Sequence, residues 1–433
     1  MQEQEEEQKR FSFTYGLVML RTSRANALMD RLGKLRIVKP LAWFLLVLMP
    51  IAAGLIFYLL AYELTILTSP RGAGVASAIR VLGPRVNFLL PGLNPYIPVV
   101  YGVIAIAVAV TIHEFSHGVV ARSLGMPVKS AGVIFFLFIP IGAFVEVDEK
   151  VVRETKPRNA LRMLAGGPGI NMLVGVACLI LLISSVSAMT PTVEGVPVIS
   201  VAQSTPQQPS PALAAGIKSG DVITAIDGTP VTDLNYTLRT SGEFQPGQAV
   251  NVTLWRDGQS IVLPVTLGNT SQTIITVNAN NVVISNKTYY FAYLGVGTFD
   301  YGGLQQEVAN YVNAYKNDPF LYMVPPSFPI GDAPQTIPFS SLMIGFYNSP
   351  LGAANSIVDN LLFWLFFVNF NLAVFNCLPI YPMDGGQAFE RFLVGAGRGR
   401  VSDALALRIT TVVTVAVLLL LVVTIGGPYL GLF

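Results

Sequence analysis

Long apolar runs separated by short polar segments make up most of this 433-residue chain. An α-helix needs about 20 predominantly apolar residues to cross roughly 30 Å of hydrocarbon. Five runs are long enough, and the pattern predicts membrane-spanning helices over Leu41–Tyr62, about Pro95–His117, about Met163–Met189, about Asn360–Pro379 and Ile409–Ile425. A sixth run, Ser130–Val145, has only sixteen residues and contains Pro140 and Gly142. Its length and β-rich composition favour a short membrane-associated element, either a β-hairpin or a re-entrant loop.

Between the third and fourth predicted spans the pattern changes to short strands and turns. Residues 190–352 are rich in Ser, Thr, Asn and Pro, and AVNVTLW (249–255) alternates apolar and polar residues, as half-buried strands do. The expected fold class is an α-helical polytopic membrane protein with about five transmembrane helices and an inserted water-soluble α+β domain. Residues 11–39 are basic and have some helical periodicity, which favours a helical segment on the membrane surface.

Charge supports the membrane prediction and orients it. Only 12% of the residues are charged, against about 25% in ordinary soluble domains. The first 39 residues carry eight Lys or Arg and the loop 122–162 carries seven, whereas the whole inserted domain carries five. Because Lys and Arg concentrate in cytoplasmic loops, we expect a cytoplasmic N-terminus and an extracytoplasmic inserted domain. A net charge of +2, without a basic stripe interleaved with aromatic residues, predicts no nucleic-acid partner.

Both histidines of the chain lie in AVAVTIHEFSHGVVAR (107–122), at the end of the second predicted span. His113 and His117 are four residues apart, so on a helix both imidazoles lie on one face and can reach one metal ion. Glu114 projects about 100° further around the helix and can contact a metal-bound water. This HExxH arrangement is typical of a zinc site with two histidine ligands and a glutamate base. A lone histidine in an apolar helix is more often structural, but a pair at ligand spacing beside a carboxylate favours metal binding.

A catalytic zinc ion keeps three protein ligands and one open position, so a third ligand must come from elsewhere. The candidates are acids beside apolar segments: Glu146, Asp148, Glu149, Asp359 and Asp384. Asp384 lies in FNCLPIYPMDGG (375–386), where two prolines break the fourth predicted helix, and broken backbone at membrane depth must line a cavity or a site. The predicted topology places Asp384 and His117 near the same membrane face, which favours Asp384 over Asp359. A turn-forming Asp-Gly remains the alternative from spacing alone.

Three motifs together, HEFSH (113–117), AGGPGIN (165–171) and NCLPIYPMDGG (376–386), resemble the site-2 protease family of intramembrane zinc metalloproteases. The similarity covers roughly residues 95–400 and implies a Zn²⁺ ion bound by His113, His117 and Asp384, with Glu114 as the general base. Met383 stands where the family usually has leucine, a swap of similar volume that leaves the ligand untouched. The first span and the basic lead-in resemble archaeal or other prokaryotic members with an extra N-terminal helix.

The resemblance implies a zinc metalloendopeptidase that hydrolyses peptide bonds within or next to transmembrane helices of membrane proteins in the lipid bilayer. Asn171 and Asn376 are polar side chains in apolar segments. Family members resemble this sequence at both positions, and we expect the two side chains to bind exposed substrate backbone. Interhelical hydrogen bonding is the alternative for both. The glycines of AGGPG are interpreted as allowing close helix packing. An exposed edge of Ser130–Val145 would pair with an extended substrate by β-augmentation, unless the element is a packed loop.

The segment ALAAGIKSGDVITAIDGTPVTD (212–233) resembles the PDZ domains of membrane-tethered and periplasmic proteases. PDZ grooves bind peptides by strand addition, which implies binding of peptide C-termini and gating of substrates; a structural spacer is the alternative. The predicted organisation is a surface segment (1–40), an N-terminal membrane part (41–191), a PDZ-like domain (192–268), an extracytoplasmic extension (269–351) and a C-terminal membrane part (352–433).

Two rival functions fit parts of the sequence. A membrane zincin of another kind would take its third ligand from a glutamate, such as Glu146, and would not need Asp384. A non-catalytic receptor or transporter would carry the HExxH motif as a vestige, and the intact Glu114 argues against it.

Overall fold

The computed structural model of the chain describes residues 11–14, 17–70, 72–136, 139–205, 210–277, 283–298, 303–322 and 345–433. Parts of the predicted segments 1–40 and 269–351 therefore lie outside the described residues. The chain divides into two compact units. The first contains Met1–Leu181, Pro319–Pro325 and Leu361–Phe433, and the second contains Leu182–Asp318 and Pro326–Asn360.

Five helical segments among the described residues are long and apolar enough to cross a membrane. This number confirms the prediction, and the segments are Val38–Leu67, Val99–Ser123, Pro157–Ser187, Gly352–Asn376 and Asp403–Leu430. Several begin earlier than hydropathy alone indicates. Helix α13 (Asp403–Leu421), for example, begins before Ile409 because the side chain of Ser402 accepts a hydrogen bond from the N–H of Leu405.

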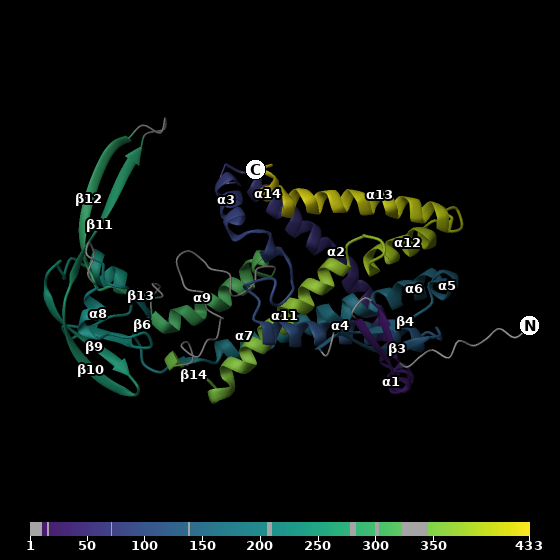
Figure 1. Ribbon diagram of the computed structural model, residues 1–433, viewed down its shortest axis with the longest axis horizontal. Helices are drawn as coiled ribbons and strands as arrows, with labels where there is room; N and C mark the ends of the chain where they lie inside the picture. Colours follow the sequence, from purple (N-terminus) through teal and green to yellow (C-terminus); the bar gives the residue numbers. More distant parts are fainter. Residues whose placement is uncertain are drawn as a thin grey trace, which may run out of the picture. The chain divides into compact units, whose positions relative to one another are not determined.

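The helices of the first unit are long spans joined by short connecting helices (Figure 1). The spans are built from α2 (Val38–Leu67), α4 (Val99–Ser123), α6 (Pro157–Leu164), α7 (Gly166–Ser187), α11 (Asn355–Asn376) and α13. The connecting helices are α1 (Ser23–Gly33), α3 (Gly72–Leu82), α5 (Glu149–Glu154), α12 (Asp384–Ala396) and α14 (Gly427–Leu430). Helix α11 supplies the most buried side chains of the core, among them Phe363, Trp364, Phe366 and Phe367, each at 0% exposure.

A four-stranded antiparallel sheet lies in the first unit, in the order β1-β2-β3-β4. Its strands are β1 (Phe11–Thr14), β2 (Leu17–Arg21), β3 (Ser130–Phe136) and β4 (Ile139–Glu146). The run Ser130–Val145 is thus a hairpin rather than a re-entrant loop. Of the segment 11–39, α1 fits the helical periodicity, whereas Phe11–Thr14 and Leu17–Arg21 form strands, and β2 pairs with β3, with Met19 opposite Ile134. Strand pairing over a long sequence separation overrides a weak local periodicity here.

The second unit contains an antiparallel sheet in the order β10-β9-β7-β6-β13, with β8 paired to β7. Figure 1 shows this sheet beside α8 (Pro211–Ala215), with the ribbon of β11 and β12 projecting from it. The remaining strands are β5 (Thr190–Pro191), β6 (Val196–Val201), β7 (Val222–Ile226), β8 (Thr229–Pro230), β9 (Ala249–Arg256), β10 (Gln259–Thr266), β11 (Gly268–Val277), β12 (Val283–Tyr293), β13 (Val296–Thr298) and β14 (Tyr347–Asn348). Helix α9 (Gly303–Asn317) follows the sheet.

The alternation predicted for AVNVTLW builds the core of this inserted domain. Val250, Val252 and Leu254 of β9 are at most 3% exposed, whereas Asn251 between them faces solvent. An α+β domain is therefore inserted between the third and fourth spans, as the sequence predicts. Its sheet takes one strand, β13, from beyond residue 268.

Candidate metal centre

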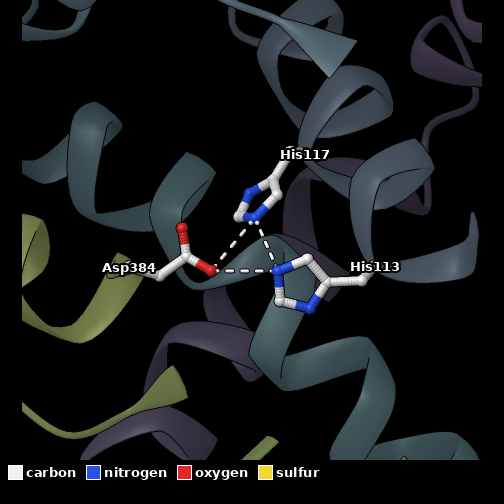
Figure 2. Close-up of side chains that lie close together, drawn as sticks. All are labelled: His113, His117 and Asp384. Atoms are coloured by element: carbon white, nitrogen blue, oxygen red, sulfur yellow. Dashed lines mark hydrogen bonds and ion pairs between the residues drawn. The ribbon is translucent and has the colours of Figure 1, made fainter. Parts of the chain in front are cut away.

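Helix α4 brings both histidines to one point in the first unit. His113 and His117 are one turn apart, and both are buried, at 6% and 8% exposure. Asp384 is the first residue of α12 and approaches them from more than 260 residues downstream. Figure 2 shows the three side chains pointing toward one another. Asp384 Oδ2 lies 3.0 Å from Nε2 of His113 and 3.3 Å from Nε2 of His117, and the two Nε2 atoms are 3.2 Å apart.

The tautomer of His117 is fixed by the backbone. Its Nδ1 lies 2.8 Å from the carbonyl oxygen of Met163, at the end of α6. A carbonyl oxygen can only accept, so Nδ1 carries the proton and donates it to this bond. In the neutral imidazole the lone pair of His117 is consequently on Nε2, the atom that faces Asp384.

These three side chains fit a zinc ion. His113 Nε2, His117 Nε2 and Asp384 Oδ2 all lie within 3.3 Å of one another. With the lone pair of His117 on Nε2, the one proton that can lie between these three atoms is that of His113, and a cation would stabilise the cluster better. Tetrahedral zinc with bonds of about 2.0–2.1 Å holds its ligand atoms about 3.3 Å apart, close to the spacing found here. Among the described residues, His113, His117 and Asp384 form the one group of three acidic, histidine or cysteine side chains able to hold a metal ion. Two imidazoles and one carboxylate leave the fourth position open, as a catalytic site requires.

Gly167 provides the space for such an ion. A Cβ atom on this residue of α7 would lie 2.6 Å from Nε2 of His113 and would collide with Nε2 of His117. The prediction that the AGGPG glycines allow helix packing holds for Gly169, whose Cβ would press on Leu45 of α2. At Gly167 the missing side chain serves the site instead. The AGGPG motif identifies both glycines as unusual, but only their positions in the structure show that Gly169 allows helix packing and Gly167 leaves space beside the ligands.

The two glycines after Asp384 have a related function. A Cβ on Gly385 would collide with the carbonyl of Leu378, and one on Gly386 with the backbone of Ile380. Bare backbone at both positions lets α12 begin directly against the turn that follows α11. This contact directs Asp384 toward α4.

Glu114 is held by a backbone group that the sequence did not reveal. Its Oε2 accepts a hydrogen bond of 3.2 Å from the N–H of Val145 in β4. Glu114 is half-buried, next to a proposed ligand and beside the edge strand of the sheet. A carboxylate in this place can accept a proton from a water at the open position of the metal.

The two predicted asparagines take different positions. Asn171 of α7 is fully buried and its Nδ2 lies 3.2 Å from Nδ1 of His113. Asn376 is the last residue of α11 and is half-buried. The structure thus brings Asn171 into contact with a proposed metal ligand.

The other acids considered as third ligands have different environments. Glu146 accepts a hydrogen bond of 2.7 Å from the hydroxyl of Ser130. Asp148 pairs with Lys129 at 2.7 Å and caps α5; the hydrogen bond from Lys129 holds the pKa of this carboxyl below its usual range. Asp359 is fully buried in α11, and the side chain of Glu149 lies outside the described part of the chain. None of the described acids other than Asp384 joins the histidine pair.

Comparison with known proteins agrees with this site. The profile of the family described as "Peptidase family M50" matches residues 101–421. A zinc metalloprotease named Rip1 from Mycobacterium bovis is 26% identical over 368 residues, covering 70% of this chain and 88% of the relative. An uncharacterised protein of Methanocaldococcus jannaschii is 28% identical over 284 residues, covering 65% and 72%. The zinc metalloprotease RasP of Shouchella clausii is 27% identical over 182 residues, covering 41% and 39%.

Proposed function

Because the chain belongs to peptidase family M50, the site-2 protease family, we propose that it is an intramembrane zinc metalloprotease. It hydrolyses peptide bonds within or next to the transmembrane helices of membrane proteins. The observation that carries this proposal is the convergence of His113 Nε2, His117 Nε2 and Asp384 Oδ2 within the unit that holds the spanning helices. The relatives named as zinc metalloproteases support the same cofactor.

The residues around the three ligands supply the acid–base chemistry. Bound zinc would lower the pKa of its water to about 7 and polarise the scissile carbonyl. Glu114 accepts the proton of the attacking water and returns it to the leaving amine. The hydrogen bond from the Val145 N–H keeps the Glu114 carboxylate beside the open position before a substrate arrives.

The edge of β4 is the proposed docking strand for an unwound substrate. The Glu146 carbonyl accepts from Lys129 on the β3 side, so the backbone groups of Val145 and Ala143 point away from β3, because successive residues of a strand alternate. An extended substrate segment that pairs with this edge has its carbonyl groups outside its own helix and exposed to attack. Asn376 is the proposed second contact for the substrate backbone.

The proposed topology places the N-terminus in the cytoplasm and the inserted domain outside. The unequal distribution of Lys and Arg among the loops supports it. The sheet of the inserted domain is compatible with a PDZ-like module that binds peptide C-termini and excludes substrates whose ectodomains have not been trimmed.

Cleavage of a single-span membrane protein in proteoliposomes tests the function. Glu114→Gln keeps the three ligands and removes the base, so the variant is expected to keep its zinc and lose cleavage by at least about a hundredfold. Glu146→Gln is the matched control and should keep both zinc and activity. A Glu114→Gln variant that cleaves as fast as wild type would refute the proposed mechanism. Loss of zinc from Glu146→Gln, with zinc retained in Asp384→Ala, would favour the zincin with a glutamate ligand.

A further inference from the structure

We propose that Asn171 is a positioning residue for the metal ligand His113, acting through Nδ1 of the imidazole. The proposal rests on the zinc site described above and assigns Asn171 to the metal rather than to the substrate. It follows from three observations at this side chain: its burial, its distance from the ring, and an unpartnered oxygen.

The geometry ties Asn171 to the ring nitrogen that does not face the metal site. Its amide lies 3.2 Å from His113 Nδ1, while Nε2 of the same ring faces Asp384. Asn171 is at 0% exposure, so water does not replace this contact. The amide oxygen of Asn171 has no hydrogen-bond partner among the described residues. A buried amide oxygen without a hydrogen-bond partner costs about 1–3 kcal/mol. We therefore expect a donor to meet this oxygen in some state of the protein.

Metal binding supplies that partner. When Nε2 of His113 gives its lone pair to a metal, the ring proton moves to Nδ1, which then must donate. The oxygen and nitrogen of an asparagine amide have nearly the same shape, and a half-turn about the last side-chain bond exchanges them. After that rotation, Oδ1 accepts the Nδ1–H, and Nδ2 takes the position that the unpartnered oxygen held.

An amide serves both states of the site. Without metal, the Nδ2 group donates to Nδ1 and the Nε2–H of His113 donates to Asp384 Oδ2, as the distances of 3.2 and 3.0 Å allow. With metal, the amide oxygen accepts from Nδ1. His117 needs no such exchange, because the Met163 carbonyl fixes its tautomer permanently. Asn171 thus gives His113 the orientation that the backbone gives His117.

The affinity of the full-length protein for zinc tests this role without any substrate. Asn171→Leu removes the acceptor at similar volume and is expected to weaken zinc binding by about 10- to 100-fold, the usual effect of losing such a partner. Asn171→Asp keeps an acceptor and is expected to bind zinc within about threefold of wild type. Asn369→Leu is the matched control, because Asn369 is also fully buried but donates to Leu365 within its own helix. Competition with a chromophoric chelator in detergent measures all four proteins.

Cobalt-substituted wild type gives a second readout that does not depend on the folding of any variant. Proton NMR should show two slowly exchanging, paramagnetically shifted imidazole N–H signals, one from each histidine, and Asn171→Asp should keep both. The proposal is overturned if Asn171→Leu binds zinc as tightly as wild type, if Asn171→Asp is as weak as Asn171→Leu, or if the cobalt protein shows only one such signal. It is also overturned if Asn171→Leu raises KM for a membrane substrate at unchanged zinc affinity. Wild type that binds no zinc at all would refute the proposed function instead.

Discussion

A Cβ atom on Gly167 would lie 2.6 Å from Nε2 of His113, well inside the range of an ordinary contact. Gly167 belongs to α7 and His113 to α4, so these two spans approach each other closely at the metal ligands. The space beside the two imidazoles therefore depends on one residue having no side chain.

Gly167→Ala is expected to weaken zinc binding by roughly 5- to 150-fold, since overpacking a buried position costs about 1–3 kcal/mol. The neighbouring Gly166→Ala is the control, because its Cβ would meet its nearest atom, the Ser116 carbonyl oxygen, at an ordinary 3.4 Å. Metal content after dialysis against graded free zinc measures the difference. Equal zinc affinity in the two variants would contradict the role given to Gly167.

Asp384→Asn is expected to lose zinc, because it keeps the shape of the ligand and removes its negative charge. The two histidines alone form a weak site, because a catalytic zinc ion is held by three protein ligands. Asp148→Asn provides the control, as Asp148 is solvent-accessible and pairs with Lys129. Zinc content of the purified proteins is the measurement, and full occupancy in Asp384→Asn would remove this residue from the ligand set.

The sequence predicted the number of spans and the histidine pair because both depend on local spacing. The length of an apolar run can be counted directly in the sequence, and two histidines four residues apart lie on the same helix face whatever surrounds them. The third ligand was different: the broken helix and the predicted topology favoured Asp384 among five acids but left a turn-forming Asp-Gly open, and the family resemblance selected it. Strand β2 was missed because its partner β3 lies more than a hundred positions away, and β1 in turn pairs with β2.

The supporting contacts of the site could not be predicted at all. The Met163 carbonyl and the Val145 N–H are backbone groups, which every residue carries and no residue type marks. Gly167 lies in a glycine-rich motif, but close helix packing and space for an ion both require glycine, so the sequence cannot distinguish them. Only the approach of α7 to α4 distinguishes these two interpretations.

Two proline substitutions separate the proposed roles of the β4 edge. Val145→Pro removes the N–H that donates to Glu114 and is expected to lower kcat by about tenfold at unchanged zinc content. Ala143→Pro removes a neighbouring outward N–H that does not contact Glu114 and is expected to raise KM. Proline is tolerated at both positions because an edge strand does not use its outward N–H groups in the sheet.

Steady-state cleavage of a membrane substrate measures both constants. An Ala143→Pro enzyme with unchanged KM would argue against substrate pairing at this edge. An unchanged kcat in Val145→Pro would show that Glu114 does not need the backbone donor.

The inserted domain depends on a buried ion pair between Asp221 and Arg256. Asp221 is 2% exposed and accepts hydrogen bonds of 2.6 and 2.7 Å from the guanidinium, whose pKa the hydrogen bonds raise. Asp221→Ala leaves the charge of Arg256 without its partner, and breaking such a pair costs about 3–5 kcal/mol. Hydrogen exchange of the full chain should become at least a hundredfold faster in β7 and β9, with Glu243→Ala, an exposed acid of the same domain, as the control. Unchanged protection in Asp221→Ala would mean that the pair contributes little to the domain.

The proposed topology predicts which introduced cysteines a membrane-impermeant maleimide reaches from outside the cell. Lys218→Cys lies on the exposed surface of the inserted domain and should be labelled in intact cells, whereas Lys150→Cys, in the Lys/Arg-rich loop before α6, should be labelled only after permeabilisation. The native Cys178 and Cys377 are both buried, so they give little background. The reason is electrostatic: the loop 122–162 carries seven Lys or Arg in 41 residues, and such loops are retained on the cytoplasmic side. The opposite labelling pattern would invert the topology and would place the open edge of the metal site on the outer side of the membrane.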